Sequence, residues 1–161
     1  KHKLEDTKLV VRNSTAQVIS MIGVLEHLQD PRGVLKEIID NKNIKYFYMS
    51  VPTFSFAVYL EIFSSSIFHR QLSGAHTHLF TENSINHFCK EFGFKIVSEW
   101  WFGTDMVDLF RHMYVSLKDL NCSEKCNLLW RDSFSRMIDS LQLEMDKKKA
   151  SDQVHMLLKK S

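Results

Sequence analysis

Two short apolar runs joined by one helical segment constrain the fold of this chain. The first run, residues 17–24, is rich in β-branched side chains and nearly continuous in apolar character, which is typical of a strand buried on both faces. Asp30 and Pro31 then predict a helix start, with Asp30 as the N-cap and Pro31 in the first helical position. The second run, residues 44–51, reads as another strand. Strand, helix and strand in this order predict a parallel crossover unit.

The rest of the chain continues the alternation of helices and strands. Thr81 is a typical N-cap and Gly93 a typical residue just beyond a helix end, so the sequence predicts a helix between them. Residues 153–159 alternate in polarity, which favours a strand, with a helix as the alternative. The sequence therefore predicts an α/β fold. Further elements are expected as a strand over 94–101 and helices over 105–117 and 128–145.

Three segments lie outside this regular pattern. Residues 1–16 are polar and weakly patterned, and we expect a connector there. Residues 53–80 begin with an aromatic stretch that either packs on the core or forms a lid, because ligands of open α/β sheets bind beyond the carboxyl ends of the strands. Residues 105–146 are expected to be a helical insertion before the last strand. All 161 residues are predicted to form part of a single domain.

Composition excludes several classes of partner and location. The net charge of +2 argues neither for nor against a nucleic acid partner, because a small basic surplus can still be clustered. No stripe of Lys and Arg alternates with aromatic residues, and we expect no such partner. No apolar run reaches the roughly 20 residues that a bilayer span needs, so no membrane is expected. Three cysteines and no visible signal peptide predict a reducing, cytoplasmic location. Cys122 and Cys126 lack a second ligand pair for zinc.

The order of these elements resembles class I S-adenosylmethionine-dependent methyltransferases. Their fourth strand and following helix are similar to VISMIGVLEHLQDPRGVLKEI, and their fifth strand to KYFYMSVPT. Their later helix and sixth strand resemble HTHLFTENSINHFCKEFGFKIVSEWW. Their closing strand, which runs antiparallel between the fifth and sixth, resembles SDQVHMLLKK. The resemblance covers residues 17–101 and the last ten residues.

This resemblance implies a Rossmann-like three-layer sandwich, here with an incomplete sheet that corresponds to strands four to seven and has an antiparallel last strand. It also implies S-adenosyl-L-methionine as cofactor and methyl transfer to a small-molecule acceptor. The aromatic candidate lid suggests that this acceptor is partly apolar or sugar-like. The chain would supply the substrate-side half of the domain. The alternative is a methyltransferase-like module for binding or assembly that has no catalytic activity.

The glycine content supports the half-domain interpretation. The family binds its cofactor at a glycine-rich turn after the first strand, but none of the five glycines here forms a G-x-G pair. A nicotinamide oxidoreductase would need such a turn as well. The chain therefore resembles the carboxyl-terminal half of a methyltransferase, as a truncation or as a natural half domain. Without the first strand, an exposed sheet edge is expected, and with it a homodimer.

The resemblance also implies roles for individual residues. Glu26 and His27 would lie at the rim of the cleft, although an acid at a helix entry and a structural imidazole are the alternatives. An imidazole there could take a proton from the acceptor as it attacks the methyl group. The implied sets are catalytic His27 and His78; cofactor-binding Gly23, Val24 and Glu26; and substrate-binding Tyr59, His69, Arg70 and His76.

A metal site is not expected. Some relatives hold a divalent ion with Glu-x-x-Glu-His and a later His, a pattern to which Glu26, His27 and His78 are similar. The first Glu of that pattern falls on Gly23, which has no side chain. A site that lacks one carboxylate is a poor match for Mg²⁺ or Zn²⁺.

Overall fold

The computed structural model describes residues 3–64, 70–72 and 76–161. The chain forms two compact units. The first consists of Lys1–Thr53, Ala75–Trp100 and Gln153–Ser161, and the second of Phe54–Gly74 and Trp101–Asp152. Among the described helices, none combines the length and the apolar character that a bilayer span requires.

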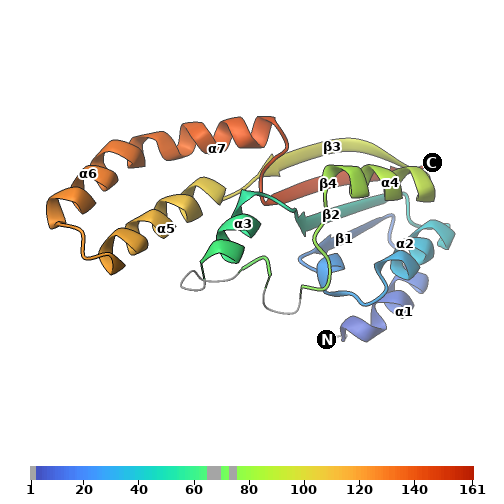
Figure 1. The fold of residues 1–161 in the computed structure, drawn as a ribbon. Coiled ribbons are helices and arrows are strands. Elements are labelled where there is room, and N and C mark those ends of the chain that lie inside the picture. The colour runs from blue at the N-terminus through green and yellow to red at the C-terminus, as the bar shows by residue number, and fades with distance from the viewer. Residues whose placement is uncertain (1–2, 65–69, 73–75) are drawn as a thin grey trace. The chain divides into compact units, whose positions relative to one another are not determined.

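The first unit is built on a mixed four-stranded sheet (Figure 1). Its strands are β1 (Val18–Ile22), β2 (Tyr46–Pro52), β3 (Phe94–Phe102) and β4 (Gln153–Lys160), in the order β1-β2-β4-β3. β1 and β2 are parallel, and β4 runs antiparallel to β2. The predicted α/β fold and the antiparallel last strand are confirmed, and the helical alternative for that segment is wrong.

One face of the sheet carries the core of this unit. Alternate residues of β2 and β4 are buried, as the two-residue period of a strand requires. They are Phe47, Met49, Val51, Val154, Met156 and Leu158. Helices α2 (Pro31–Asp40) and α4 (Glu82–Phe92) contribute Ile38 and Ile85, both fully buried.

The helix boundaries predicted from local signals are confirmed. The Asp30 carboxylate accepts a hydrogen bond from the Gly33 N–H at 2.8 Å, and Pro31 is the first residue of α2. Thr81 caps α4 by accepting from the Ser84 N–H at 3.1 Å. Gly93 follows α4 with φ of 70°, a left-handed conformation that favours glycine.

The first elements of the chain differ from expectation. The segment expected to be a connector forms η1 (Leu4–Asp6) and α1 (Thr7–Arg12). The expectation that the first strand is buried on both faces is wrong, because Val18 is 53% exposed and Ile22 is 61% exposed. β1 is a terminal strand of the sheet, so among the described residues no strand pairs with its other edge.

The second unit is helical. It contains α3 (Phe56–Phe63), α5 (Asp105–Asp119), α6 (Glu124–Phe134), η3 (Ser135–Met137) and α7 (Ile138–Lys147). The single helix expected over 128–145 is wrong, because α6 starts at Glu124 and the 3-10 turn η3 separates it from α7. Trp130 stacks between Phe110 of α5 and Phe134 at the end of α6, with ring centroids 5.8 and 4.2 Å apart.

Candidate functional site

The carboxyl end of β1 turns sharply into the segment that carries the candidate acid and imidazole. Gly23 has φ of 64°, and its N–H donates to the Ser50 carbonyl at the end of β2. The 3-10 turn η2 (Leu25–His27) follows Val24. Because the carboxyl ends of parallel strands meet at one edge of a sheet, this turn places Glu26 and His27 where α/β proteins hold ligands.

A second segment is tied to this turn through the main chain. The Glu26 carbonyl accepts hydrogen bonds from the N–H groups of Thr77 and His78, at 2.8 and 3.2 Å. The Thr77 hydroxyl lies 2.9 Å from the same carbonyl and 3.1 Å from that of Leu28. Thr77 lies 51 residues after Glu26 and 49 residues after Leu28 in the sequence. These bonds therefore bring two distant segments into one site.

Three side chains with groups able to ligate a metal converge there. Glu26 is only 4% exposed, although it carries a carboxylate. The Nε2 atom of His27 lies 3.9 Å from the Oε1 atom of Glu26. The ring centroids of His27 and His76 are 4.9 Å apart. One ligand atom from each of Glu26, His27 and His76 lies within 4.8 Å of the others. The structure therefore groups His76, rather than the expected His78, with the acid and imidazole.

His78 has a different neighbour. Its Nδ1 atom lies 2.8 Å from the Thr77 hydroxyl oxygen. That hydroxyl has a single proton, and two carbonyl oxygens within hydrogen-bond distance compete for it. We therefore assign the proton of the contact to His78 Nδ1, which donates to Thr77. In the neutral ring, Nε2 then keeps its lone pair and can accept a proton.

A hollow of about 580 Å³ borders His27 and Leu28. This volume lies in the range of small-molecule sites. Its wall includes Lys8, which forms an ion pair with Asp30 at 2.5 Å. The hydrogen bond from Lys8 and that from the Gly33 N–H lower the pKa of Asp30. A second, more apolar hollow of about 460 Å³ runs along β1 and α1 and includes Val24, one of the expected cofactor contacts.

The remaining expected substrate contacts belong to the second unit or lie outside the described residues. Tyr59 on α3 is 47% exposed, and its ring meets that of Phe54 edge-on at 5.5 Å. The Arg70 guanidinium forms ion pairs with Asp108 and Asp152. His69 lies outside the described residues. The roles assigned to all these residues stay predictions.

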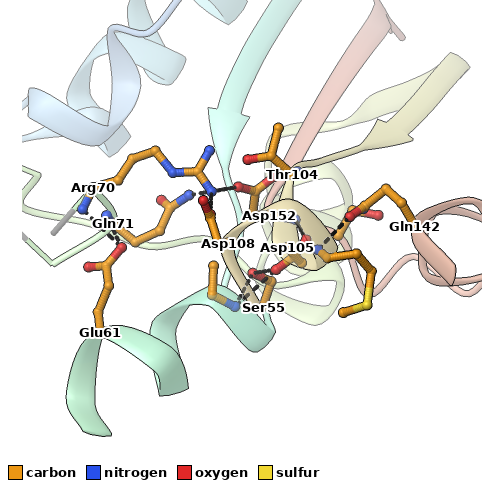
Figure 2. A network of polar contacts seen from close by, with 12 residues as sticks. Ser55, Glu61, Arg70, Gln71, Thr104, Asp105, Asp108, Gln142 and Asp152 are labelled. Carbon is orange, nitrogen blue, oxygen red and sulfur yellow. Dashed lines mark hydrogen bonds and ion pairs between the residues drawn. The ribbon is translucent and has the colours of Figure 1, made fainter. Parts of the chain in front are cut away.

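The partners of Arg70 belong to a buried polar network that the sequence did not predict (Figure 2). Asp105 is fully buried and accepts hydrogen bonds from the N–H groups of Ala57 and Asp152, at 2.9 and 3.0 Å. Ser55 donates its hydroxyl proton to the same carboxylate. The only local signals were an N-cap serine before α3 and an acid at the start of α5, and neither indicates a contact between them.

Glu61 fixes the chain segment that carries Arg70. Its carboxylate is 5% exposed and accepts hydrogen bonds from three successive N–H groups, those of Arg70, Gln71 and Leu72. The three donor-to-acceptor distances are 2.9, 2.7 and 2.8 Å. Glu61 therefore holds the main chain of residues 70–72 against α3, while the side chain of Arg70 contacts Asp108 and Asp152.

Burial raises the pKa values of two acids in this network. Burial raises the pKa of Asp152 to about 6, and nearby Asp105 adds to the rise while Arg70 opposes it. Burial also raises the pKa of Asp108, again against the effect of Arg70. A single guanidinium thus only partly compensates the carboxylates around it.

Comparison with known proteins identifies relatives for the chain. A family model described as "Methyltransferase domain" matches residues 1–99. No curated protein matches significantly. Among solved structures, the small RNA methyltransferase HEN1 is similar in fold, with a TM-score of 0.50 and 9% identity, over 91% of this chain and 14% of that one.

Two further solved structures align over most of this chain. A Galdieria sulphuraria protein assigned as a sarcosine dimethylglycine methyltransferase has a TM-score of 0.45 and 14% identity, over 90% of this chain and 53% of that one. The cyclase SpnF has a TM-score of 0.44 and 10% identity, over 93% of this chain and 53% of that one. The chain thus spans between 14% and 53% of these three proteins.

Proposed function

This chain belongs to the methyltransferase-domain family, and on that premise we propose that it supplies the substrate-side half of an enzyme that transfers a methyl group from S-adenosylmethionine to a small-molecule acceptor. The four strands would correspond to strands four to seven of a Rossmann-like three-layer sandwich. The rest of the cofactor site would come from a polypeptide segment other than these 161 residues.

One observation carries this proposal. The turn after β1 and the segment 76–78 gather a buried carboxylate and imidazoles at the carboxyl end of two parallel strands. That end of an open α/β sheet is where substrates and cofactors bind. The adjoining hollow of about 580 Å³ suits a small acceptor rather than a macromolecule.

His78 is the best base among the described residues of this site. Its Nδ1–H donates to Thr77, which leaves the Nε2 lone pair to accept a proton from an acceptor hydroxyl or amine. His27 is the second choice, because it faces Glu26 and His76 instead. Both would act by removing a proton from the acceptor, while positioning supplies most of the rate enhancement.

The residues of this chain do not fit S-adenosylmethionine as a complete site. Gly23 provides one left-handed turn at the carboxyl end of β1, but the sequence contains no G-x-G pair that would let the main chain approach the cofactor closely. The cofactor would supply the methyl group, and we derive no step through it.

Titration calorimetry with S-adenosylhomocysteine tests the proposal. We expect no heat of binding with the 161-residue chain. We expect micromolar binding with the polypeptide made from the complete coding sequence, together with methyl transfer from S-adenosylmethionine. Micromolar binding to the 161 residues alone would contradict the half-domain part, because the cofactor site would then be built from these residues or across a dimer.

A module without catalytic activity is the second candidate, and the missing glycine-rich turn is the observation that favours it. It predicts that the complete polypeptide binds S-adenosylhomocysteine no better than the 161-residue chain does. That result would overturn methyl transfer and leave a role in binding or assembly.

A further inference from the structure

We propose that a second copy of this chain binds the apolar stripe formed by Phe134, Met137 and Leu141, in an antiparallel pair whose two-fold axis passes between Met137 and Ile138. The proposal concerns the second unit alone and does not rest on methyl transfer. It is also separate from the edge of β1, which belongs to the first unit. The interface would be isologous, so that each residue meets the one equally far beyond the axis in the other copy.

The stripe consists of large side chains that the second unit leaves uncovered. α6, η3 and α7 run one after another beside α5 (Figure 1). In these three elements, which the structure describes completely, the polar Gln142 is the only buried residue. Phe134, Met137 and Leu141 are spaced three and four residues apart, as on one helix face, and are 44, 45 and 43% exposed. Helices normally bury such a stripe against another element, so this face lacks a partner layer.

An aromatic stack holds one end of the stripe in place. The Phe134 ring stacks on Trp130 with centroids 4.2 Å apart, and Trp130 stacks in turn on Phe110 of α5. The Trp130 indole N–H also donates to the Phe110 carbonyl at 3.3 Å. Phe134 is therefore an anchor that is ordered before a partner binds, which lowers the entropic cost of association.

The sequence around the proposed axis is complementary to its own reverse. In an antiparallel pair, residues equally far from the axis on either side lie opposite each other. Three kinds of apolar pair would then form, each of them twice: Met137 with Ile138, Phe134 with Leu141 and Trp130 with Met145. Each residue of the stripe thus meets an apolar residue of the second copy.

The charged residues favour an antiparallel second copy as the occupant. The same register places Arg136 opposite Asp139 and Arg131 opposite Glu144, and all four residues are exposed. A parallel pair would instead place each residue beside its own copy and bring like charges together. Exposed ion pairs contribute little affinity, so these contacts would set the orientation while the apolar stripe supplies most of the affinity.

Sedimentation equilibrium of the Val18→Lys variant tests the proposal, because this background weakens any pairing through β1. We expect a dimer with a dissociation constant on the order of ten micromolar, since the interface is small. Leu141→Lys should raise this constant at least tenfold. Leu143→Lys is the matched control, because Leu143 is 53% exposed on the same helix but points about 200° away from Leu141. A monomer at hundreds of micromolar, or equal effects of the two substitutions, overturns the proposal.

Charge exchange tests the register of the pair. Arg136→Asp places two acids opposite each other at both symmetry-related positions, and Asp139→Arg places two arginines there. Each single variant should raise the dissociation constant about tenfold, and the double variant should recover the affinity of the background. Circular dichroism establishes that every variant is folded. A double variant that is as weak as the single variants would contradict this register.

Disulfide cross-linking locates the axis. The background is Cys122→Ser, Cys126→Ser, which keeps only the buried Cys89. Met137→Cys would lie beside its own copy, so oxidation with copper–phenanthroline should give a linked dimer. Leu129→Cys is the control, because its copy would lie about 26 Å away along the helices at 1.5 Å per residue. Linkage through position 129, or none through position 137, contradicts an axis between Met137 and Ile138.

Discussion

The Arg70 guanidinium donates to the carboxylate of Asp152, a residue that is 2% exposed. The same guanidinium also contacts Asp108. Arg70 thus forms ion pairs with two acids of the second unit. The pair with Asp152 should contribute more to stability, because water cannot solvate that buried carboxylate in place of Arg70.

Arg70→Gln should destabilise the protein by about 2–3 kcal/mol, because it leaves buried carboxylates without their cation. The expected loss is smaller than for a fully buried ion pair, because the Arg70 side chain is 36% exposed. Urea unfolding followed by tryptophan fluorescence measures the change. Arg131→Gln is the matched control, since the pair that Arg131 forms with Asp132 is exposed on both sides and should contribute little. Equal effects of the two substitutions would contradict the structural role of Arg70.

Asp152 should make the free energy of unfolding depend on pH. Its pKa in the folded protein is raised to about 6 from an ordinary value of 3.8, so the native state binds this proton more tightly than the unfolded state does. The resulting stabilisation is complete below pH 3.8 and is lost as the pH rises through 6, and it amounts to at most about 3 kcal/mol.

Asp152→Asn isolates this contribution from other titrations. Urea unfolding at pH 5 and pH 7.5 gives, for each protein, the change in the free energy of unfolding between the two pH values. We expect this free energy to fall more in the wild type than in the variant. Parallel pH profiles would show that Asp152 does not titrate with a raised pKa. Asp119→Asn, at the exposed end of α5, should keep the wild-type profile.

Cys89 should resist alkylation in the native protein. It is 5% exposed, and burial raises the pKa of its thiol to about 11, so the reactive thiolate is scarce at neutral pH. Cys122 is half-buried and Cys126 is exposed. Peptide mass mapping after brief iodoacetamide treatment should find label on Cys126 first and on Cys89 only after denaturation. Early labelling of Cys89 would mean that α4 opens readily.

The edge of β1 should promote self-association. Val18 is 53% exposed on this terminal strand, and unpaired strand edges tend to pair with another chain. Light scattering at tens of micromolar should detect a dimer that Val18→Lys weakens. Val97→Lys is the comparison at the other edge, because Val97 is also 53% exposed and lies on β3, the second terminal strand of the sheet. A monomeric wild type, or an equal effect of both variants, would contradict pairing through β1.

Local signals predicted much of this fold. Asp30, Thr81 and Gly93 set helix boundaries through hydrogen bonds or φ angles within a few residues, and such effects can be read from neighbouring letters. The exposure of β1 could not be predicted from its composition, because it depends on which strand lies beside it. Apolar content alone predicted burial on both faces.

The candidate site was predictable in part for the same reason. Glu26 and His27 follow a strand directly, so their place at its carboxyl end was expected. The choice between His76 and His78 depends on how Thr77 bonds to a main chain about 50 residues away, which no local pattern encodes. The contacts of Arg70 with Asp108 and Asp152 join positions 38 and 82 residues apart.

The main chain and the side chain of Glu26 have different roles in the site. Its carbonyl oxygen accepts the bonds that tie residues 77 and 78 to the turn, whereas its carboxylate faces the imidazoles. The hydrogen bonds that join the two segments therefore do not use the side chain. A substitution at position 26 can change the chemistry of the site while these main-chain bonds persist.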